Sequence, residues 1–250
     1  MKTALITGAS GGLGREIALQ CGRYFPEIEE YWLIARRTEK IEEYAQRLGG
    51  AKVRAISLDL AKDESYAALA ELLAREKPEI ALLVNNAGLG YWGAAEKLPV
   101  EKQINCVDVN VKAVSAVTAI ALPYMRAGSR AVFVSSIASF VPNAYMAVYS
   151  ATKAYVTSYA RALRYELKGR KIGVTVVCPG PMDTEFIAAG GVKSKTFEKL
   201  PYCDVRKVAV GALRAAKKGR FIYTNKLFYK FYRFLAKVLP AAWLVPAAKT

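Results

Sequence analysis

The chain has 250 residues, of which 53% are hydrophobic, and it carries a formal net charge of +16 without a single histidine. This length and composition suit one α/β domain with a sizeable core. The lack of histidine excludes Ser-His-Asp and Cys-His catalytic units, and the four scattered cysteines give no basis for a metal site. We find no apolar run of about eighteen residues and no signal-peptide pattern, and therefore expect a cytoplasmic protein without a membrane span.

Apolar runs of strand length recur along the chain and are mostly separated by stretches long enough for a helix. They cover residues 3–7, 31–35, 53–58, 80–84, 130–134, 173–177 and 220–224. This alternation predicts right-handed crossovers and a parallel sheet. We therefore predict a single-domain, Rossmann-type doubly wound α/β fold with about seven strands. Residues 1–225 would form the cofactor-binding and catalytic domain, and residues 226–250 a basic amphipathic C-terminal extension of it.

A glycine-rich segment follows the first predicted strand. Gly8, Gly12 and Gly14 have the spacing Gly-x-x-x-Gly-x-Gly, just where a helix is predicted to begin near Leu13. Glycines allow a tight turn and a close approach to a pyrophosphate, while the helix N-terminus offers unpaired N–H groups. Although glycines also occur in ordinary turns, this placement predicts that the loop, with Ser10 and Leu13, holds a dinucleotide.

Two arginines, Arg36 and Arg37, follow the second predicted strand. A dinucleotide fold that prefers NAD usually has an acidic residue here, for the ribose 2′-hydroxyl. A guanidinium instead matches a 2′-phosphate, so we favour NADP(H) as the cofactor and keep NAD(H) as the alternative. The simpler interpretation is that both arginines are only solvated.

Polar residues also end the third and fourth predicted strands. Asp59 is placed to accept a hydrogen bond from the adenine amino group, or else to cap the next helix. Asn86, Ala87 and Gly88 follow the fourth strand, where short side chains let the backbone approach the cofactor. We predict that these residues form part of the cofactor site.

A tyrosine and a lysine, Tyr149 and Lys153, lie four residues apart after the fifth predicted strand, and Ser136 lies thirteen residues before the tyrosine. On a helix this spacing puts the phenol and the ammonium on one face. A neighbouring cation lowers the pKa of a phenol, so Tyr149 could give and take a proton. An aromatic contact beside a solvated charge is the alternative.

Together with Asn110, Pro179, Gly180 and Thr184, these motifs resemble the short-chain dehydrogenase/reductase family from Lys2 to about Thr224. The resemblance implies a catalytic set of Ser136, Tyr149, Lys153 and Asn110. In it Ser136 binds the substrate oxygen, Tyr149 exchanges the proton, and Lys153 lowers the pKa of Tyr149 and holds the nicotinamide ribose. Asn110 anchors a water, Pro179 and Gly180 border the nicotinamide, and Thr184 binds its carboxamide.

The activity that the resemblance implies is hydride transfer between NADP(H) and a carbonyl or secondary alcohol, by a homodimer or homotetramer. The alternative is a non-catalytic dinucleotide-sensing module on the same fold. We expect a bulky hydrophobic substrate, because aromatic residues gather near the predicted cleft and in a predicted lid over residues 185–202. These candidate substrate residues are Tyr91, Trp92, Phe140, Tyr145 and Phe186.

The C-terminal region is strongly basic, since no Asp or Glu occurs after residue 204. One predicted helical stripe holds Lys226, Lys230, Arg233 and Lys237, and another holds Leu227, Phe231, Phe234, Leu235 and Val238. Such a helix suits its own domain, a partner subunit or an anionic membrane surface, and we rank the first two above peripheral membrane contact. Nucleic-acid binding is not expected, because no recognition motif accompanies the charge.

Overall fold

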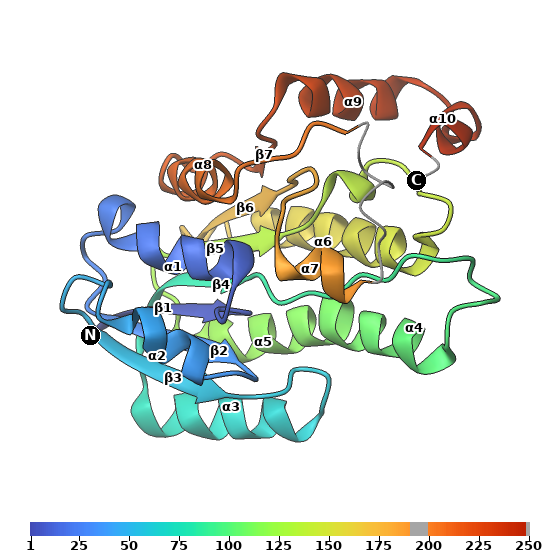
Figure 1. Ribbon diagram of the computed structural model, residues 1–250. Helices are drawn as coiled ribbons and strands as arrows, with labels where there is room; N and C mark the ends of the chain where they lie inside the picture. The colour runs from blue at the N-terminus through green and yellow to red at the C-terminus, as the bar shows by residue number, and fades with distance from the viewer. Residues whose placement is uncertain (191–199, 249–250) are drawn as a thin grey trace.

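The strands of the protein form one parallel sheet in the computed structural model, which describes residues 1–190 and 200–248 (Figure 1). The strand order is β3-β2-β1-β4-β5-β6-β7, which confirms the predicted doubly wound fold. The strands are β1 (Lys2–Thr7), β2 (Glu30–Ala35), β3 (Lys52–Ser57), β4 (Glu79–Asn85), β5 (Arg130–Val134), β6 (Gly173–Val177) and β7 (Ile222–Tyr223).

Helices cover both faces of the sheet (Figure 1). Buried residues of α1 (Gly12–Tyr24), α2 (Glu39–Ala45) and α8 (Val205–Lys217) pack on one face, and those of α3 (Glu64–Glu76), α5 (Ala113–Ala121) and α6 (Ala147–Glu166) on the other. The remaining helical segments are α4 (Val100–Val107), η1 (Asp108–Lys112), η2 (Leu122–Tyr124), η3 (Ile137–Ser139), α7 (Glu185–Ala189), α9 (Leu227–Val238) and α10 (Ala241–Ala247).

The central strands are mostly apolar because both of their faces are buried. In β1, Ala4 and Ile6 belong to the core beneath α1 and α8, whereas Leu5 belongs to the core beneath α3 and α5. Successive side chains of a strand point to opposite faces, so a strand between two helix layers needs an unbroken apolar run. This is the physical reason that apolar runs located the strands.

The last strand is shorter than the sequence predicted. Residues 220–224 were expected to be extended, but β7 covers only Ile222–Tyr223 and pairs with Val176 and Val177 of β6. It lies at the edge of the sheet and has a partner on one side only. An edge strand forms ladder hydrogen bonds on one side only, so fewer bonds keep its backbone extended and the strand is short.

One helix is relevant to the expectation that no segment of the chain spans a membrane. The continuous helix Val100–Tyr124 is long and apolar enough by length and composition, with a mean hydropathy of 1.4. Asp108 and Lys112 interrupt the apolar residues of this helix, so its sequence contains no unbroken apolar run of about eighteen residues. Its second half, α5, packs against α3 and β4, and so belongs to the helix layer of the sheet.

Candidate active site

The strand order reverses between β1 and β4, and the glycine-rich turn lies at that point. Gly8 and Gly12 have positive φ angles, +65° and +51°, which non-glycine residues rarely adopt. A β-carbon on Gly14 would lie 2.2 Å from the carbonyl oxygen of Gly8, so α1 approaches the turn more closely than any other residue would permit. In open α/β sheets, ligands bind at such a reversal point.

Asn86 ties the ends of β1 and β4 together. Its side-chain amide donates hydrogen bonds to the carbonyl oxygens of Thr7 (3.0 Å) and Gly8 (3.1 Å). The backbone N–H groups of Asn86 and Ala87 donate to the Thr7 hydroxyl, at 3.0 and 3.1 Å. These hydrogen bonds support the predicted structural role of Asn86 in the cofactor loop.

The first turn of α1 is suited to bind an anion. Its N-cap is Gly11, which offers no side-chain cap, and the turn contains no acidic residue. The unpaired N–H groups and the positive end of the helix dipole therefore face the turn, and the carboxylate beside it is that of Glu185, 4.0 Å from where a β-carbon of Gly11 would lie. These features fit a pyrophosphate.

A cleft of about 370 Å³ opens at the carboxyl edge of the sheet. Most of the predicted site residues line it: Gly8, Ser10, Gly12, Leu13, Arg36, Arg37, Asp59, Asn86, Ala87, Gly88, Ser136, Tyr149, Lys153, Pro179, Gly180 and Thr184. Two of the predicted catalytic and cofactor-binding residues do not. Gly14 lies behind the turn, where it permits close packing, and Asn110 is fully buried behind Gly88.

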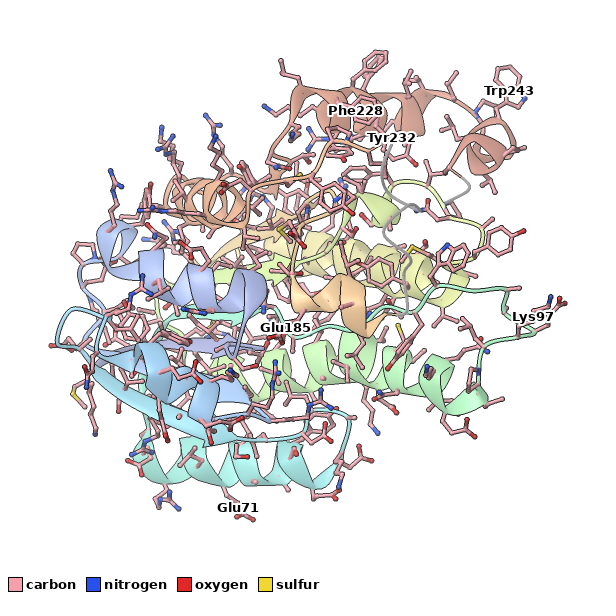
Figure 2. The ribbon with its side chains drawn as sticks, viewed as in Figure 1. Glu71, Lys97, Glu185, Phe228, Tyr232 and Trp243 are labelled. Atoms are coloured by element: carbon pink, nitrogen blue, oxygen red, sulfur yellow. The ribbon has the colours of Figure 1, made fainter. Side chains whose placement is uncertain are left out.

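The two arginines after β2 have different surroundings. Arg37 forms an ion pair with Glu185 at 2.5 Å, and both residues line the cleft. Glu185 is the first residue of α7 and is labelled in Figure 2. The pair raises the pKa of Arg37 and lowers that of Glu185. Both side chains are about half exposed or more, so the pair contributes little to stability. Within the described residues Arg36 has no salt bridge and is open to a ligand.

Asp59 is engaged in a local turn, but it is not the helix cap that the alternative interpretation expected, because the N-cap of α3 is Asp63. Its carboxylate accepts a hydrogen bond from the backbone N–H of Ala61 at 3.2 Å. This is an Asx-type turn ahead of α3, although the residue also lines the cleft. Its second carboxylate oxygen is therefore the one that a ligand would meet.

Tyr149 lies deep in the cleft, close to Ser136. Burial raises the pKa of the Tyr149 hydroxyl to about 12, and a hydrogen bond with Ser136 lowers it only in part. This result is opposite to the expected lowering of the Tyr149 pKa by Lys153. The Lys153 amine instead donates to the carbonyl oxygen of Val134 at 3.0 Å, and burial lowers its own pKa to about 8. For Tyr149 and Lys153 alike, loss of hydration on burial has a larger effect on the pKa than the attraction between phenolate and ammonium.

Asn110 holds the neighbouring loop. Its amide donates to the Leu89 carbonyl at 2.8 Å and to the Thr152 hydroxyl at 3.0 Å, and its oxygen accepts from the Leu89 N–H at 2.8 Å. It lies in η1, a short π-helical turn between α4 and α5. Because these contacts use its donors and acceptor, Asn110 positions the backbone beside Gly88 and Lys153.

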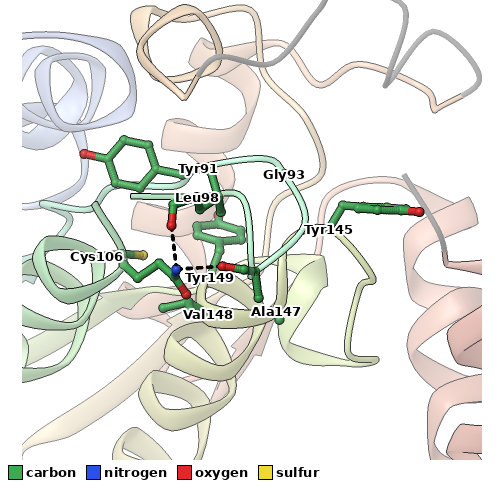
Figure 3. A pocket seen from close by; sticks show the side chains of 10 residues that line it. Tyr91, Gly93, Leu98, Cys106, Tyr145, Ala147, Val148 and Tyr149 are labelled. Carbon is green, nitrogen blue, oxygen red and sulfur yellow. Dashed lines mark hydrogen bonds between the residues drawn. The ribbon is translucent and has the colours of Figure 1, made fainter. Parts of the chain in front are cut away.

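The candidate substrate residues divide into two groups. Phe186 lines the cleft with its ring 5.7 Å from that of Tyr149, and Tyr91 lines it as well. Tyr145 lines a smaller adjoining pocket with Tyr91, and points away from Tyr149 in Figure 3. Trp92 packs on Tyr145 at 5.8 Å, outside the cleft lining.

Phe140 also lies outside the cleft lining, because it packs against Tyr232 of α9 with the ring centres 6.3 Å apart. Its predicted role in substrate contact is therefore not supported by its position. The predicted lid is described only in part: α7 and residues 200–202 lie within the described ranges, and residues 191–199 lie outside them.

Sequence reasoning missed several residues of the cleft wall, among them Leu89, Asn143, Met146, Met182, Ile187 and Leu200. Asn143 is distinctive because its side-chain oxygen is buried and has no hydrogen-bond partner in the described part of the chain. A buried acceptor without a partner costs free energy unless a ligand satisfies it. Only its position six residues before Tyr149 would have pointed to it in the sequence.

A glycine-rich turn at the reversal point of a parallel sheet, with a buried tyrosine and lysine in the same cleft, is typical of dinucleotide-binding α/β proteins. The profile of the family described as short chain dehydrogenase matches residues 2–192. The chain therefore belongs to the short-chain dehydrogenase family of oxidoreductases.

Individual relatives agree with this assignment. An uncharacterized oxidoreductase of Myxococcus xanthus is 34% identical over 189 residues, covering 75% of this chain and 74% of that protein. An 11-beta-hydroxysteroid dehydrogenase of Pinus massoniana is 32% identical over 215 residues, covering 84% of this chain but 59% of the relative. A 3-oxoacyl-acyl-carrier-protein reductase of Pseudomonas aeruginosa is 31% identical over 186 residues, covering 74% and 75%.

Solved structures show the same fold. A short-chain dehydrogenase from Sphingobium yanoikuyae in complex with NADPH has a TM-score of 0.81 at 25% identity, covering 96% of this chain and 97% of that one. A short-chain dehydrogenase/reductase from Burkholderia phymatum in complex with NAD also has a TM-score of 0.81, at 22% identity, covering 94% and 92%. The likeness extends beyond residue 192, where the family profile ends.

Proposed function

We propose that the protein transfers a hydride between NADP(H) and a carbonyl or secondary alcohol. The observation that carries the proposal is the placement of Tyr149, Ser136 and Lys153 in the same cleft as the glycine-rich turn. The nicotinamide cofactor supplies or accepts the hydride, and the protein must supply the proton and the orientation. A phenol can transfer the proton, a hydroxyl can orient the substrate oxygen by a hydrogen bond, and an ammonium can stabilise the phenolate.

Binding of the cofactor rests on the turn and on Arg36. The N–H groups at the start of α1 would hold the pyrophosphate, and Arg36, with no salt bridge in the described ranges, would bind the 2′-phosphate. Arg37 would join it on release from Glu185. The NADPH complex of the Sphingobium relative supports this choice, and NAD(H) is the alternative.

The proton step follows from the two shifted pKa values. With a pKa of about 12, the Tyr149 hydroxyl is protonated at neutral pH and is ready to donate to a carbonyl oxygen that gains negative charge. Ser136 donates a second hydrogen bond to that oxygen. Lys153, with a pKa of about 8, is charged at neutral pH and stabilises the phenolate that remains. Oxidation of an alcohol uses the same groups in reverse.

The substrate side of the cleft favours a bulky apolar molecule. Tyr91, Phe186, Met182 and Ile187 line this side. Asn143 adds one buried acceptor, suited to a hydroxyl on the substrate. The similarity to a plant hydroxysteroid dehydrogenase supports a substrate of this class.

The test is oxidation of NADPH, followed by absorbance, with a panel of aldehydes, ketones and steroids. Tyr149→Phe should abolish turnover while NADPH binding, measured by fluorescence titration, stays the same. Tyr155→Phe is the matched control: it lies on the same helix and bonds Ser115 at 2.7 Å, away from the cleft. If wild type consumes no NADPH with any substrate, the protein is instead a dinucleotide-sensing module.

We also propose that the protein is a homodimer or homotetramer. Three apolar residues of α4, Val100, Ile104 and Val107, are exposed, and Tyr165 of α6 is exposed as well. Apolar residues at this helical spacing suit a helix–helix interface. Light scattering should give a mass of two or four chains, and Ile104→Glu should lower it. A monomeric wild type would refute the proposal.

A further inference from the structure

Within the described residues, helix α9 contacts the rest of the domain through one face. Tyr229 is fully buried and packs directly over Gly180, where a β-carbon would lie 2.2 Å from its ring. Its hydroxyl donates a hydrogen bond to the carbonyl oxygen of Pro201 at 2.9 Å. Tyr232, on the same inner face, packs on Phe140. These contacts fix which side of the helix points outward.

The outer face of α9 is apolar and exposed. We call this surface the outer stripe; its members are Leu227, Phe228, Phe231, Phe234 and Val238, each between 53% and 80% exposed. On a helix, the spacing of residues 227, 231, 234 and 238 forms one continuous row, opposite Tyr229. Trp243 of α10 is exposed beyond its end, at the periphery of the molecule (Figure 2). A contiguous apolar surface of this kind marks an interaction site.

Cations border the outer stripe on one side. Lys230 and Lys237 lie four residues before and three residues after Phe234, and hence beside it on the helix surface. Among the described residues no salt bridge involves α9, and no acidic residue follows Asp204 in the chain. The charge of this surface is therefore uncompensated.

We propose that α9 is an interfacial helix that lies on an anionic membrane, with the outer stripe among the lipid chains and Lys230 and Lys237 at the phosphates. Exposed Phe, Leu and Trp beside lysines are the composition of helices that bind this way. A second copy of the chain suits the surface less well, because a two-fold contact would oppose like charges. A nucleic acid would leave the outer stripe exposed to water. The sequence alone ranked membrane contact lower, because it did not show which face Tyr229 covers.

The test is flotation of the full-length protein with phosphatidylcholine vesicles, with and without one third phosphatidylglycerol, at low and high salt. Wild type should float with the anionic vesicles and much less with the neutral ones. Phe231→Ser combined with Phe234→Ser should weaken binding about tenfold or more, because it removes the centre of the outer stripe. Lys230→Glu combined with Lys237→Glu should weaken it by a similar factor, and should reduce its salt dependence.

Two controls separate membrane binding from other effects. Lys62→Glu combined with Lys168→Glu makes the same change in net charge at exposed sites away from α9, and should retain at least most of the binding. Circular dichroism should confirm that each variant is folded. Wild type that does not float on anionic vesicles would overturn the proposal. Undiminished vesicle binding by the Phe231→Ser, Phe234→Ser variant would also overturn it. If wild type does not bind vesicles and this variant loses oligomer mass, the outer stripe is instead a contact between copies of the chain.

Discussion

Lys153 should destabilise the folded protein at neutral pH. Its side chain is buried, and among the described residues its amine makes one hydrogen bond, to the carbonyl of Val134. Burial is the largest cause of its low pKa. Burying a positive charge without an acidic partner costs free energy, and the pKa falls to reduce that cost. Replacement by methionine, which has a similar length and no charge, should therefore make the fold more stable while it abolishes turnover.

The magnitude follows from the two pKa values of Lys153. The interval between 10.5, its ordinary value, and about 8 in the folded protein corresponds to about 3 kcal/mol. The lost hydrogen bond to Val134 offsets about 1 kcal/mol of this. Lys153→Met should thus raise the free energy of unfolding by about 2 kcal/mol.

The pH dependence has a definite sign. The folded protein holds the proton of Lys153 less tightly than the unfolded chain does, so the penalty is complete below pH 8. It disappears as the pH rises from about 8 to 10.5, because the amine is then neutral in both states. The stability gain of Lys153→Met should vanish over the same window.

Urea unfolding without cofactor, followed by circular dichroism at several pH values across this window, measures the effect. Lys168→Met, at an exposed position beyond the end of α6, is the matched control and should change stability by less than about 0.5 kcal/mol. A Lys153→Met protein that is less stable than wild type at pH 7, or a gain that is independent of pH, would refute the reasoning.

Three further substitutions test other parts of the site. Gly14→Ala would put a β-carbon 2.2 Å from a backbone oxygen. Urea unfolding should therefore show a free energy of unfolding lower by about 1–3 kcal/mol, and titration should show weaker NADPH binding. Gly169→Ala is the control and should have little effect, because the space around Gly169 is open. Equal stability of the two variants would contradict the close approach of α1. Glu185→Gln should free Arg37 and tighten NADPH binding several-fold without a matching gain for NADH; an equal gain for both cofactors would show that Arg37 does not reach the 2′-phosphate. Asn143→Ala should raise the KM of a hydroxylated substrate about tenfold and leave that of its deoxy analogue unchanged, and an equal rise for both would rule out a hydrogen bond to the hydroxyl.

Local patterns in the sequence were sufficient for the sheet and for most of the cofactor cleft. Gly8 and Gly12 adopt the positive φ angles that a tight turn requires, and Arg36 follows β2 directly. Such features depend on residues a few positions apart, and the carboxyl ends of parallel strands all lie at one edge. Motifs at strand ends therefore meet in space wherever they occur along the chain.

Tertiary structure decided what surrounds each of these groups. The ion pair of Arg37 joins residues 148 positions apart, and the pKa of Tyr149 rises because helices and loops from distant parts of the chain exclude water from it. Trp92 and Phe140 were predicted at the cleft from their aromatic character, yet the fold packs both elsewhere. Burial and long-range pairing depend on how the crossovers bring segments together, which no short pattern contains.

The C-terminal helix shows the same division in a single element. Its amphipathic sequence determined that it would be a helix with one apolar row and one basic row. Only the packing of Tyr229 over Gly180 decided that the apolar row faces outward. An amphipathic pattern specifies the faces of a helix, but the contacts of the fold choose which face is buried.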